Sequence, residues 1–160
     1  MRLYIIRHGK AHKHSESGLD DDRSLKGHGE AQAAFLGKAL AASTAKPDVI
    51  LASPILRAAQ TAEIINQQLA LEIHTREPLS TRSGEREALA EIATWASHGC
   101  VAVVGHNPTL ETLVAILCRP TQQQFNGLRT GECIAIDFDG PMGAKLGRFV
   151  ASIRLSGDDD

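Results

Sequence analysis

Short apolar runs that alternate with longer amphipathic stretches constrain the fold of this chain more than any other feature. Leu3–Ile6, Val49–Ala52 and Val101–Val104 are continuous apolar segments, and such segments are typical of strands that are covered on both faces of a parallel sheet. Three further strands are predicted at Leu71–His74, Cys133–Phe138 and Phe149–Ile153.

Apolar residues recur every three or four positions in the segments between these strands, which predicts four helices. In chain order, the positions expected to be buried are Ala31, Phe35, Ala39 and Ala42; Ala58, Ala62, Ile65 and Leu69; Leu89, Ile92, Ala93 and Ala96; and Leu110, Leu113, Val114 and Leu117. Ser53 and Pro54 are expected to open the second helix. The third should run from about residue 84 to 97 with Ser83 as its cap, and Asn107 and Pro108 should open the fourth.

Strands that alternate with helices predict an α/β fold, a three-layer α/β/α sandwich around a mostly parallel sheet of about six strands. The last two predicted strands have no helix between them and should form an antiparallel hairpin at the sheet edge, around residues 140–147. A chain of 160 residues is about one domain long. We therefore expect one domain over residues 1–156, and a short disordered acidic tail at 157–160.

The overall charge argues against a nucleic acid or a membrane as the partner. The net charge is −2, with 22% charged and 42% apolar residues, so no positive excess is available to meet phosphates in bulk. No segment approaches the roughly 20 apolar residues of a membrane span. The three cysteines, Cys100, Cys118 and Cys133, are widely spaced in apolar runs, which predicts free thiols in a reducing cytoplasm.

Reactive side chains follow three of the predicted strands. Arg7 and His8 come directly after the first strand, Arg57 lies near the start of the second helix, and His106 and Asn107 follow the fourth strand. A single histidine at a strand end is more often structural, and a single arginine more often pairs with a nearby acid. Ligands of open α/β sheets bind at the carboxyl ends of the strands, so we expect these side chains to converge on one site.

Such a set of side chains suits phosphoryl transfer. Two guanidinium groups can hold phosphoryl oxygens in a planar fork, and a neutral imidazole is a good nucleophile near pH 7. A second imidazole, if protonated, would stabilise the charge that develops on the phosphoryl oxygens. These side chains supply the positive charge themselves, so we expect no metal and no cofactor.

These residues resemble the histidine phosphatase superfamily, also called the phosphoglycerate mutase-like family, over roughly residues 3–118. The resemblance rests on four motifs in the family's order: Arg7-His8-Gly9; Leu25-x-x-x-Gly29-x-x-Gln32-Ala33; Ser53-Pro54-x-x-Arg57-Ala58-x-Gln60-Thr61-Ala62; and Gly105-His106-Asn107. It implies a phosphoglycerate mutase-like fold and a catalytic His8 that forms a phosphohistidine intermediate. The phosphate-binding residues that it implies are Arg7, Arg57, His106, Gly9 and Asn107.

Within the superfamily, the short chain most resembles the SixA-type phosphohistidine phosphatases. Larger members carry insertions that roof the pocket, whereas here only residues 70–85 separate the second and third predicted helices. The site should therefore be open and suited to a phosphate displayed on a protein, such as a histidine-phosphorylated signalling domain. Inorganic phosphate or sulfate is expected to bind in the same pocket.

The sequence departs from the family at the general acid and at Lys26, where the family usually has Ser or Thr. Glu85 is the tentative acid, with Glu77 as the other near candidate and Asp20–Asp22 behind them. Glu85 could instead simply begin the third helix, where a carboxylate is favourable. Loss of the acid affects phosphate esters most, because a P–N bond leaves readily once its nitrogen is protonated.

The favoured function is therefore a metal-independent phosphatase that removes phosphate from phosphohistidine. The alternatives are a small-molecule phosphomonoesterase of the same superfamily and a non-catalytic module that docks phosphoproteins. His12, His14 and His28 fit no standard metal-ligand spacing and are expected in a solvated loop. Arg23 could reach the phosphate, or it could pair with the neighbouring aspartates.

Overall fold

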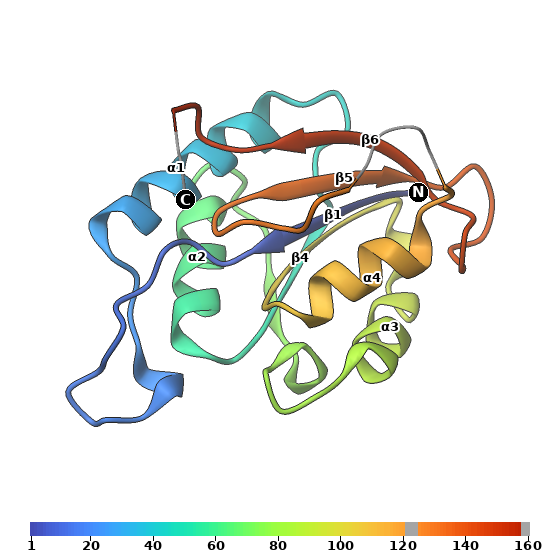
Figure 1. Cartoon of the computed structure of the whole chain (residues 1–160). Coiled ribbons are helices and arrows are strands. Elements are labelled where there is room, and N and C mark those ends of the chain that lie inside the picture. The colour runs from blue at the N-terminus through green and yellow to red at the C-terminus, as the bar shows by residue number, and fades with distance from the viewer. Residues whose placement is uncertain (121–124, 158–160) are drawn as a thin grey trace.

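A computed structural model, which describes residues 1–120 and 125–157, confirms the predicted α/β/α sandwich (Figure 1). The strands are β1 Arg2–Arg7, β2 Val49–Ala52, β3 Ile73–Thr75, β4 Cys100–Gly105, β5 Cys133–Asp137 and β6 Arg148–Ile153. The α-helices are α1 Gly27–Ala42, α2 Leu56–Asn66, α3 Glu85–Ala93 and α4 Thr109–Leu117. The short 3₁₀ helices are η1 Asp20–Asp22, η2 Glu77–Leu79 and η3 Ala96–His98.

The described residues form one sheet of six strands in the order β3-β2-β4-β1-β5-β6. β1, β2, β3 and β4 are parallel to one another, β5 is antiparallel to both of its neighbours, and the β5–β6 hairpin lies at the edge as predicted. β1 and β4 are central neighbours whose register pairs Arg7 with Gly105. The carboxyl ends of these two strands therefore lie side by side (Figure 1).

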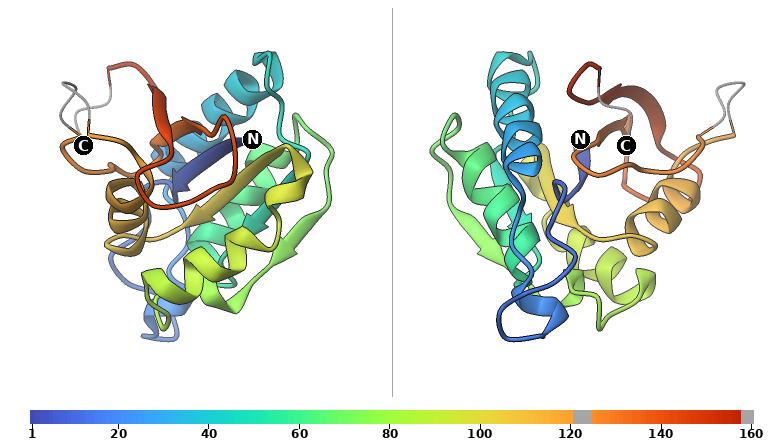
Figure 2. Two further views of the ribbon diagram at one scale, coloured as in Figure 1. Left: turned by 90° about the vertical axis from the view of Figure 1, so that its right-hand side faces the viewer. Right: turned by 60° about the vertical axis from the view of Figure 1, so that its left-hand side comes forward.

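Alternate residues of β1 face opposite helical layers. Tyr4 and Ile6 pack in one apolar cluster with buried residues of α1 and α2, whereas Leu3 and Ile5 pack in a second cluster with residues of α3 and α4. Figure 2 shows the two pairs of helices on opposite sides of the sheet. Because a strand turns successive side chains to opposite faces, the apolar run 3–6 supplies both halves of the core.

The predicted buried face of the first helix is wrong. Ala31 and Ala42 are exposed and Phe35 is half-buried, whereas the buried face of α1 consists of Gly29, Gln32, Ala33, Leu36, Gly37 and Leu40. The physical reason is a close contact at the start of the helix, where Gly29 lies against the backbone of the loop that follows β1. That contact sets the rotation of the helix about its axis.

The predicted start of the second helix is also wrong, because α2 begins at Leu56 with Ile55 in the capping position. The hydroxyl of Ser53 accepts a hydrogen bond from the Ile55 N–H at 3.2 Å and also contacts a histidine of the site described below. The third helix is shorter than predicted and is capped at Gly84, whose N–H donates to the Glu87 carboxylate at 3.1 Å.

The structure also bears on the predicted free thiols and on the predicted tail. Cys100 and Cys133 are buried, Cys118 is half-buried, and all three are free. Burial raises the pKa of Cys100 to about 12, which keeps this thiol protonated and unreactive. In residues 1–120 and 125–157, no helix is long and apolar enough to cross a membrane. Most of the tail predicted to be disordered, residues 158–160, lies outside the described residues.

Candidate active site

His8 and His106 lie next to each other at the carboxyl edge of the sheet. Each follows a central strand directly, and the register between β1 and β4 places them side by side. Their ring centroids are 5.2 Å apart, with the ring planes tilted by 54°. Only 8% of His8 and 4% of His106 is exposed. The sequence therefore predicted correctly that the two histidines come together.

The hydrogen bonds of His8 define which nitrogen can act as a nucleophile. Its Nδ1 lies 2.7 Å from the Gly9 carbonyl oxygen, and because a carbonyl can only accept, Nδ1 must carry the proton. Arg57 Nε donates to His8 Nε2 at 3.3 Å, which requires a lone pair on Nε2. Burial, together with repulsion from Arg57 and Arg7, lowers the pKa of His8 to about 4, so the imidazole is neutral near pH 7.

His106 is neutral as well. Burial lowers its pKa to about 3, and His8 and Arg57 contribute to the same shift. The expectation of a protonated second imidazole is therefore not met in this arrangement of the site. His106 Nε2 lies 2.8 Å from the Ser53 hydroxyl, and its buried Nδ1 has no hydrogen-bond partner among the described residues. With the Ser53 hydroxyl donating to Nε2, Nδ1 carries the proton of the neutral ring and can donate it to a phosphoryl oxygen.

Arg57 donates hydrogen bonds to both His8 and Asp20. Its guanidinium is buried, with 5% of the side chain exposed. Besides the bond to His8, NH1 donates to the Asp20 carbonyl oxygen at 3.0 Å and NH2 to Asp20 Oδ2 at 3.1 Å. Arg23 Nε donates to Asp20 Oδ1 at 2.9 Å. Both sequence-based alternatives for Arg57 thus apply, since it pairs with an acid and also lies at the site.

The loop before β5 closes one side of the site. Arg7 NH1 donates to the Leu128 carbonyl oxygen at 3.0 Å, and Asn107 Nδ2 donates to the same oxygen at 2.7 Å. The backbone N–H of Gly131 donates to the carbonyl oxygens of Arg7 and His8 at 3.2 and 3.0 Å. These contacts hold the end of β1, and they attach the Asn107 side chain to the loop before β5.

Gly9 is required by a backbone crossing. A Cβ at Gly9 would lie 2.5 Å from the carbonyl oxygen of Gly29, and a Cβ at Gly29 would lie 2.1 Å from that of Lys10. The N–H of Gly9 donates to Thr61 Oγ1 at 3.0 Å, and this hydroxyl donates to the Arg57 carbonyl at 2.7 Å. The loop after His8 is therefore joined to both α1 and α2.

These side chains surround a cavity of about 330 Å³. It is lined by Arg7, His8, Lys10, Ala11, Arg23, Arg57, Thr81, His106, Asn107 and Thr130. Four of these residues are cationic, and among the described residues no carboxylate lines the cavity. Arg23 both lines the cavity and pairs with Asp20, so both alternatives for it apply, whereas Lys10 was not assigned to the site. The charge of Lys10 beside the Arg-His motif was the available signal, but the conformation of the long loop that carries Arg23 does not follow from its sequence.

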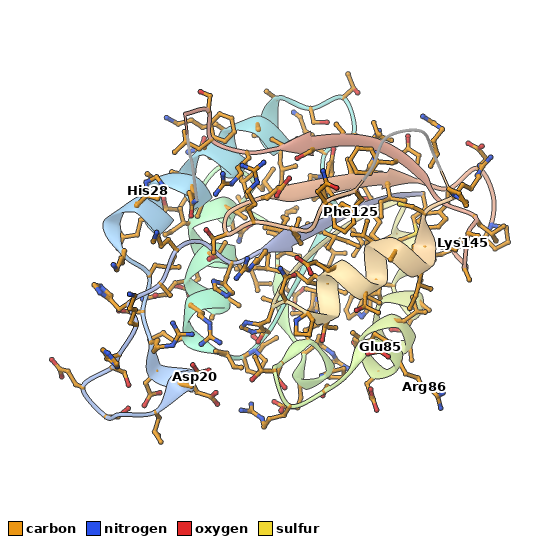
Figure 3. The ribbon with its side chains drawn as sticks, viewed as in Figure 1. Asp20, His28, Glu85, Arg86, Phe125 and Lys145 are labelled. Atoms are coloured by element: carbon orange, nitrogen blue, oxygen red, sulfur yellow. The ribbon has the colours of Figure 1, made fainter. Side chains whose placement is uncertain are left out.

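The tentative acid Glu85 is not brought into the cavity. It is the exposed first residue of α3 and does not line the cavity, and Figure 3 shows it on α3, whereas Asp20 lies on the first loop. Glu77 is exposed and accepts hydrogen bonds from Arg82 Nε at 2.8 Å and Ser80 Oγ at 3.1 Å. Those bonds hold its pKa below the usual range, which does not suit a proton donor.

Similar sequences agree with the motifs. The profile of the histidine phosphatase superfamily (branch 1) matches residues 3–85, which include the first three motifs but not the fourth. An uncharacterized protein of Picosynechococcus sp. is 33% identical over 142 residues, which covers 82% of this chain and 86% of that protein.

Solved structures share the fold. The protein histidine phosphatase SixA complexed with tungstate has a TM-score of 0.81 at 24% identity, over 96% of this chain and 97% of that one. An Agrobacterium tumefaciens protein provisionally named phosphohistidine phosphatase SixA has a TM-score of 0.79 at 26% identity, over 95% and 96%. The alpha-ribazole phosphatase of Shigella flexneri has a TM-score of 0.70 at 17% identity, over 94% and 95%. The profile match, which covers more than half of the chain, shows that this chain belongs to the histidine phosphatase superfamily, a superfamily of phosphatases.

Proposed function

We propose that this protein removes phosphate from a phosphohistidine side chain of another protein, through a phosphorylated His8. The cytoplasmic partner would be a histidine-phosphorylated signalling domain. Support comes from the neutral, buried His8, whose Nε2 is unprotonated and accepts a hydrogen bond from Arg57, from the cationic cavity around it, and from similarity to the Agrobacterium tumefaciens SixA protein.

We favour phosphohistidine over a phosphate ester as the substrate because no carboxylate is among the described residues that line the cavity. An alkoxide that leaves from a phosphate ester needs a proton from a nearby acid. The imidazole of phosphohistidine has a basic nitrogen that can take its proton from water before the bond breaks. A cavity lined by arginines, a lysine and neutral histidines therefore favours P–N over P–O cleavage.

The reaction would proceed in two displacements. His8 Nε2 attacks phosphorus while the P–N bond to the protonated substrate imidazole breaks, and the electron pair of that bond leaves with the imidazole. Arg7, Arg57 and Arg23 would balance the charge on the phosphoryl oxygens, and His106 Nδ1 would bind one of these oxygens. Water then attacks the phosphorus of phospho-His8, the second P–N bond breaks, and phosphate is released while a proton of the water passes to solvent.

A small-molecule phosphomonoesterase is the second candidate, because the fold is shared with the alpha-ribazole phosphatase of Shigella flexneri. This function would require an acid from outside the described cavity lining, or the substrate's own acid.

The test compares hydrolysis of a phosphohistidine peptide and phosphoramidate with that of p-nitrophenyl phosphate and sugar phosphates, in the presence of chelator. The variant is His8→Ala, and the matched control is His14→Ala, because His14 is an exposed histidine of the first loop. We expect faster turnover of the P–N substrates, lost in His8→Ala and kept in His14→Ala. Faster turnover of the esters would favour the phosphomonoesterase, and phosphate binding without turnover would favour a docking module.

A further inference from the structure

One carboxylate joins two arginines of the cavity. Asp20 Oδ2 accepts from Arg57 NH2 at 3.1 Å, and Asp20 Oδ1 accepts from Arg23 Nε at 2.9 Å. The backbone carbonyl of the same residue accepts from Arg57 NH1 at 3.0 Å. These N–H groups belong to cavity-lining side chains, and guanidinium N–H groups are the donors that a phosphoryl group uses.

We infer that Asp20 is a specificity-determining residue that competes with phosphate for Arg57 and Arg23. Arg57 Nε is bonded to His8 and its NH1 and NH2 are bonded to Asp20. Three of the five guanidinium N–H groups of Arg57 are thus in use, and movement of the Asp20 carboxylate would free the one on Nη2 for a phosphoryl oxygen. The inference rests on the proposed function only to the extent that both place phosphate in this cavity.

The surroundings of Asp20 allow its carboxylate to leave. Its side chain is 60% exposed, so the displaced carboxylate would enter water at little cost. The short helix η1 has other anchors, because Asp21 Oδ2 accepts from Arg82 NH1 at 2.5 Å and Asp22 Oδ2 accepts from Ser17 Oγ at 2.6 Å. The turn can therefore keep its place while the Asp20 side chain swings out.

The competition would have two consequences for turnover. It would weaken the binding of inorganic phosphate, because this ligand has only its phosphoryl oxygens with which to displace the carboxylate. A phosphorylated protein makes further contacts around the cavity and can pay that cost. Return of the carboxylate after hydrolysis would then help to expel the product, so that the enzyme discriminates against free phosphate.

A purely structural role for Asp20 would change the affinity for phosphate in the opposite direction. If the carboxylate only held Arg57 and Arg23 in position, its neutralisation would leave both arginines less ordered and phosphate would bind more weakly. If it competes, the same change removes a competing anion and phosphate binds more tightly. The sign of the change in affinity therefore decides between the two roles.

The experiment measures the dissociation constant of inorganic phosphate by calorimetry near pH 7.5 for four proteins: wild type, Asp20→Asn, Asp20→Glu and Asp22→Asn. An exposed ion pair is typically worth up to about 1 kcal/mol, so Asp20→Asn should bind phosphate about threefold to fivefold more tightly. Asp20→Glu, which restores the carboxylate, should return toward wild type. Asp22→Asn makes the same charge change in the same turn and should leave the affinity nearly unchanged.

Two results would overturn the inference: unchanged or weaker binding in Asp20→Asn, or equal tightening in Asp22→Asn, which would indicate a general charge effect. Should Asp20→Asn fail to fold, Asp20→Ser is subject to the same expectation. Binding of phosphate does not require turnover. If the enzyme did not prefer P–N substrates, the phosphate-binding test would still be valid. If Asp20→Asn weakened phosphate binding, the proposed hydrolysis of phosphohistidine would still stand.

Discussion

Burial of two neutral histidines should make the stability of this protein fall between pH 7 and pH 5. Burial lowers the pKa of His8 from 6.5 to about 4 and that of His106 to about 3. In this pH window the unfolded chain binds protons at both positions and the folded chain does not. Folding is therefore opposed increasingly as the pH falls through 6.5.

The magnitude at pH 5 depends mainly on the unfolded state. A histidine with a pKa of 6.5 when unfolded and below about 4.5 when folded loses about 2 kcal/mol of stabilising free energy between pH 7 and pH 5. This loss depends little on the exact folded-state pKa, because both imidazoles are still mostly neutral in the folded protein at pH 5. The pair should together account for about 4 kcal/mol.

The assay is urea unfolding of wild type, His8→Asn and His14→Asn at pH 7 and pH 5. Comparison of the two pH values within each protein cancels the fixed cost of the substitution. His8→Asn should lose about 2 kcal/mol less than wild type on acidification. The exposed His14 is the matched control, because its replacement also removes one histidine but leaves the buried pair in place. An equal loss in wild type and His8→Asn would show that His8 takes up its proton in the folded protein, and would refute the reasoning.

Two further predictions concern the supports of the site. Gly29→Ala should destabilise the protein by about 3 kcal/mol, because its Cβ would lie 2.1 Å from the Lys10 carbonyl oxygen. Gly27→Ala, where no atom lies within 4 Å, should not destabilise it, and equal melting temperatures for the two variants would contradict this explanation. Ser53→Ala removes the hydrogen-bond partner of His106 and should lower kcat about tenfold at a stability cost of about 1 kcal/mol. Unchanged kcat would mean that Ser53 does not orient the ring.

The strands and the meeting of the two histidines were predictable because two independent signals coincide. Continuous apolar runs identify buried parallel strands, and the reactive residues follow those runs directly. Parallel strands end at one edge, so residues that are far apart in sequence could be assigned to one site. The order of the strands, which makes β1 and β4 neighbours, does not follow from these signals.

The face of α1 could not be predicted, because an alanine-rich helix is apolar on several sides. Besides the close contact at Gly29, the buried face includes Gln32, whose side chain accepts from the Lys10 N–H at 2.9 Å and donates to the Thr130 carbonyl at 3.1 Å. Both partners lie outside the helix, and one of them is 98 residues away in sequence. No periodicity within the helix contains that information.

The contact between Asp20 and Arg57 was unpredictable for a different reason. Three consecutive aspartates are equivalent in the sequence, yet among the described residues each has a different partner. Asp20 bonds to Arg57, Asp21 to Arg82 and Asp22 to Ser17. The geometry of η1 decides which carboxylate reaches Arg57.

The central position of β1 has a consequence for how the protein is made. This strand leaves the ribosome well before its neighbours β4 and β5, which lie at residues 100–105 and 133–137. At typical synthesis rates, β1 remains unpaired for on the order of ten seconds before both neighbours have been made. During that time the nascent chain exposes a segment that can aggregate, so we expect chaperones to bind it there. A chain that stops before β5 would also lack one of the two neighbours that hold the end of β1, and would have no phosphatase activity.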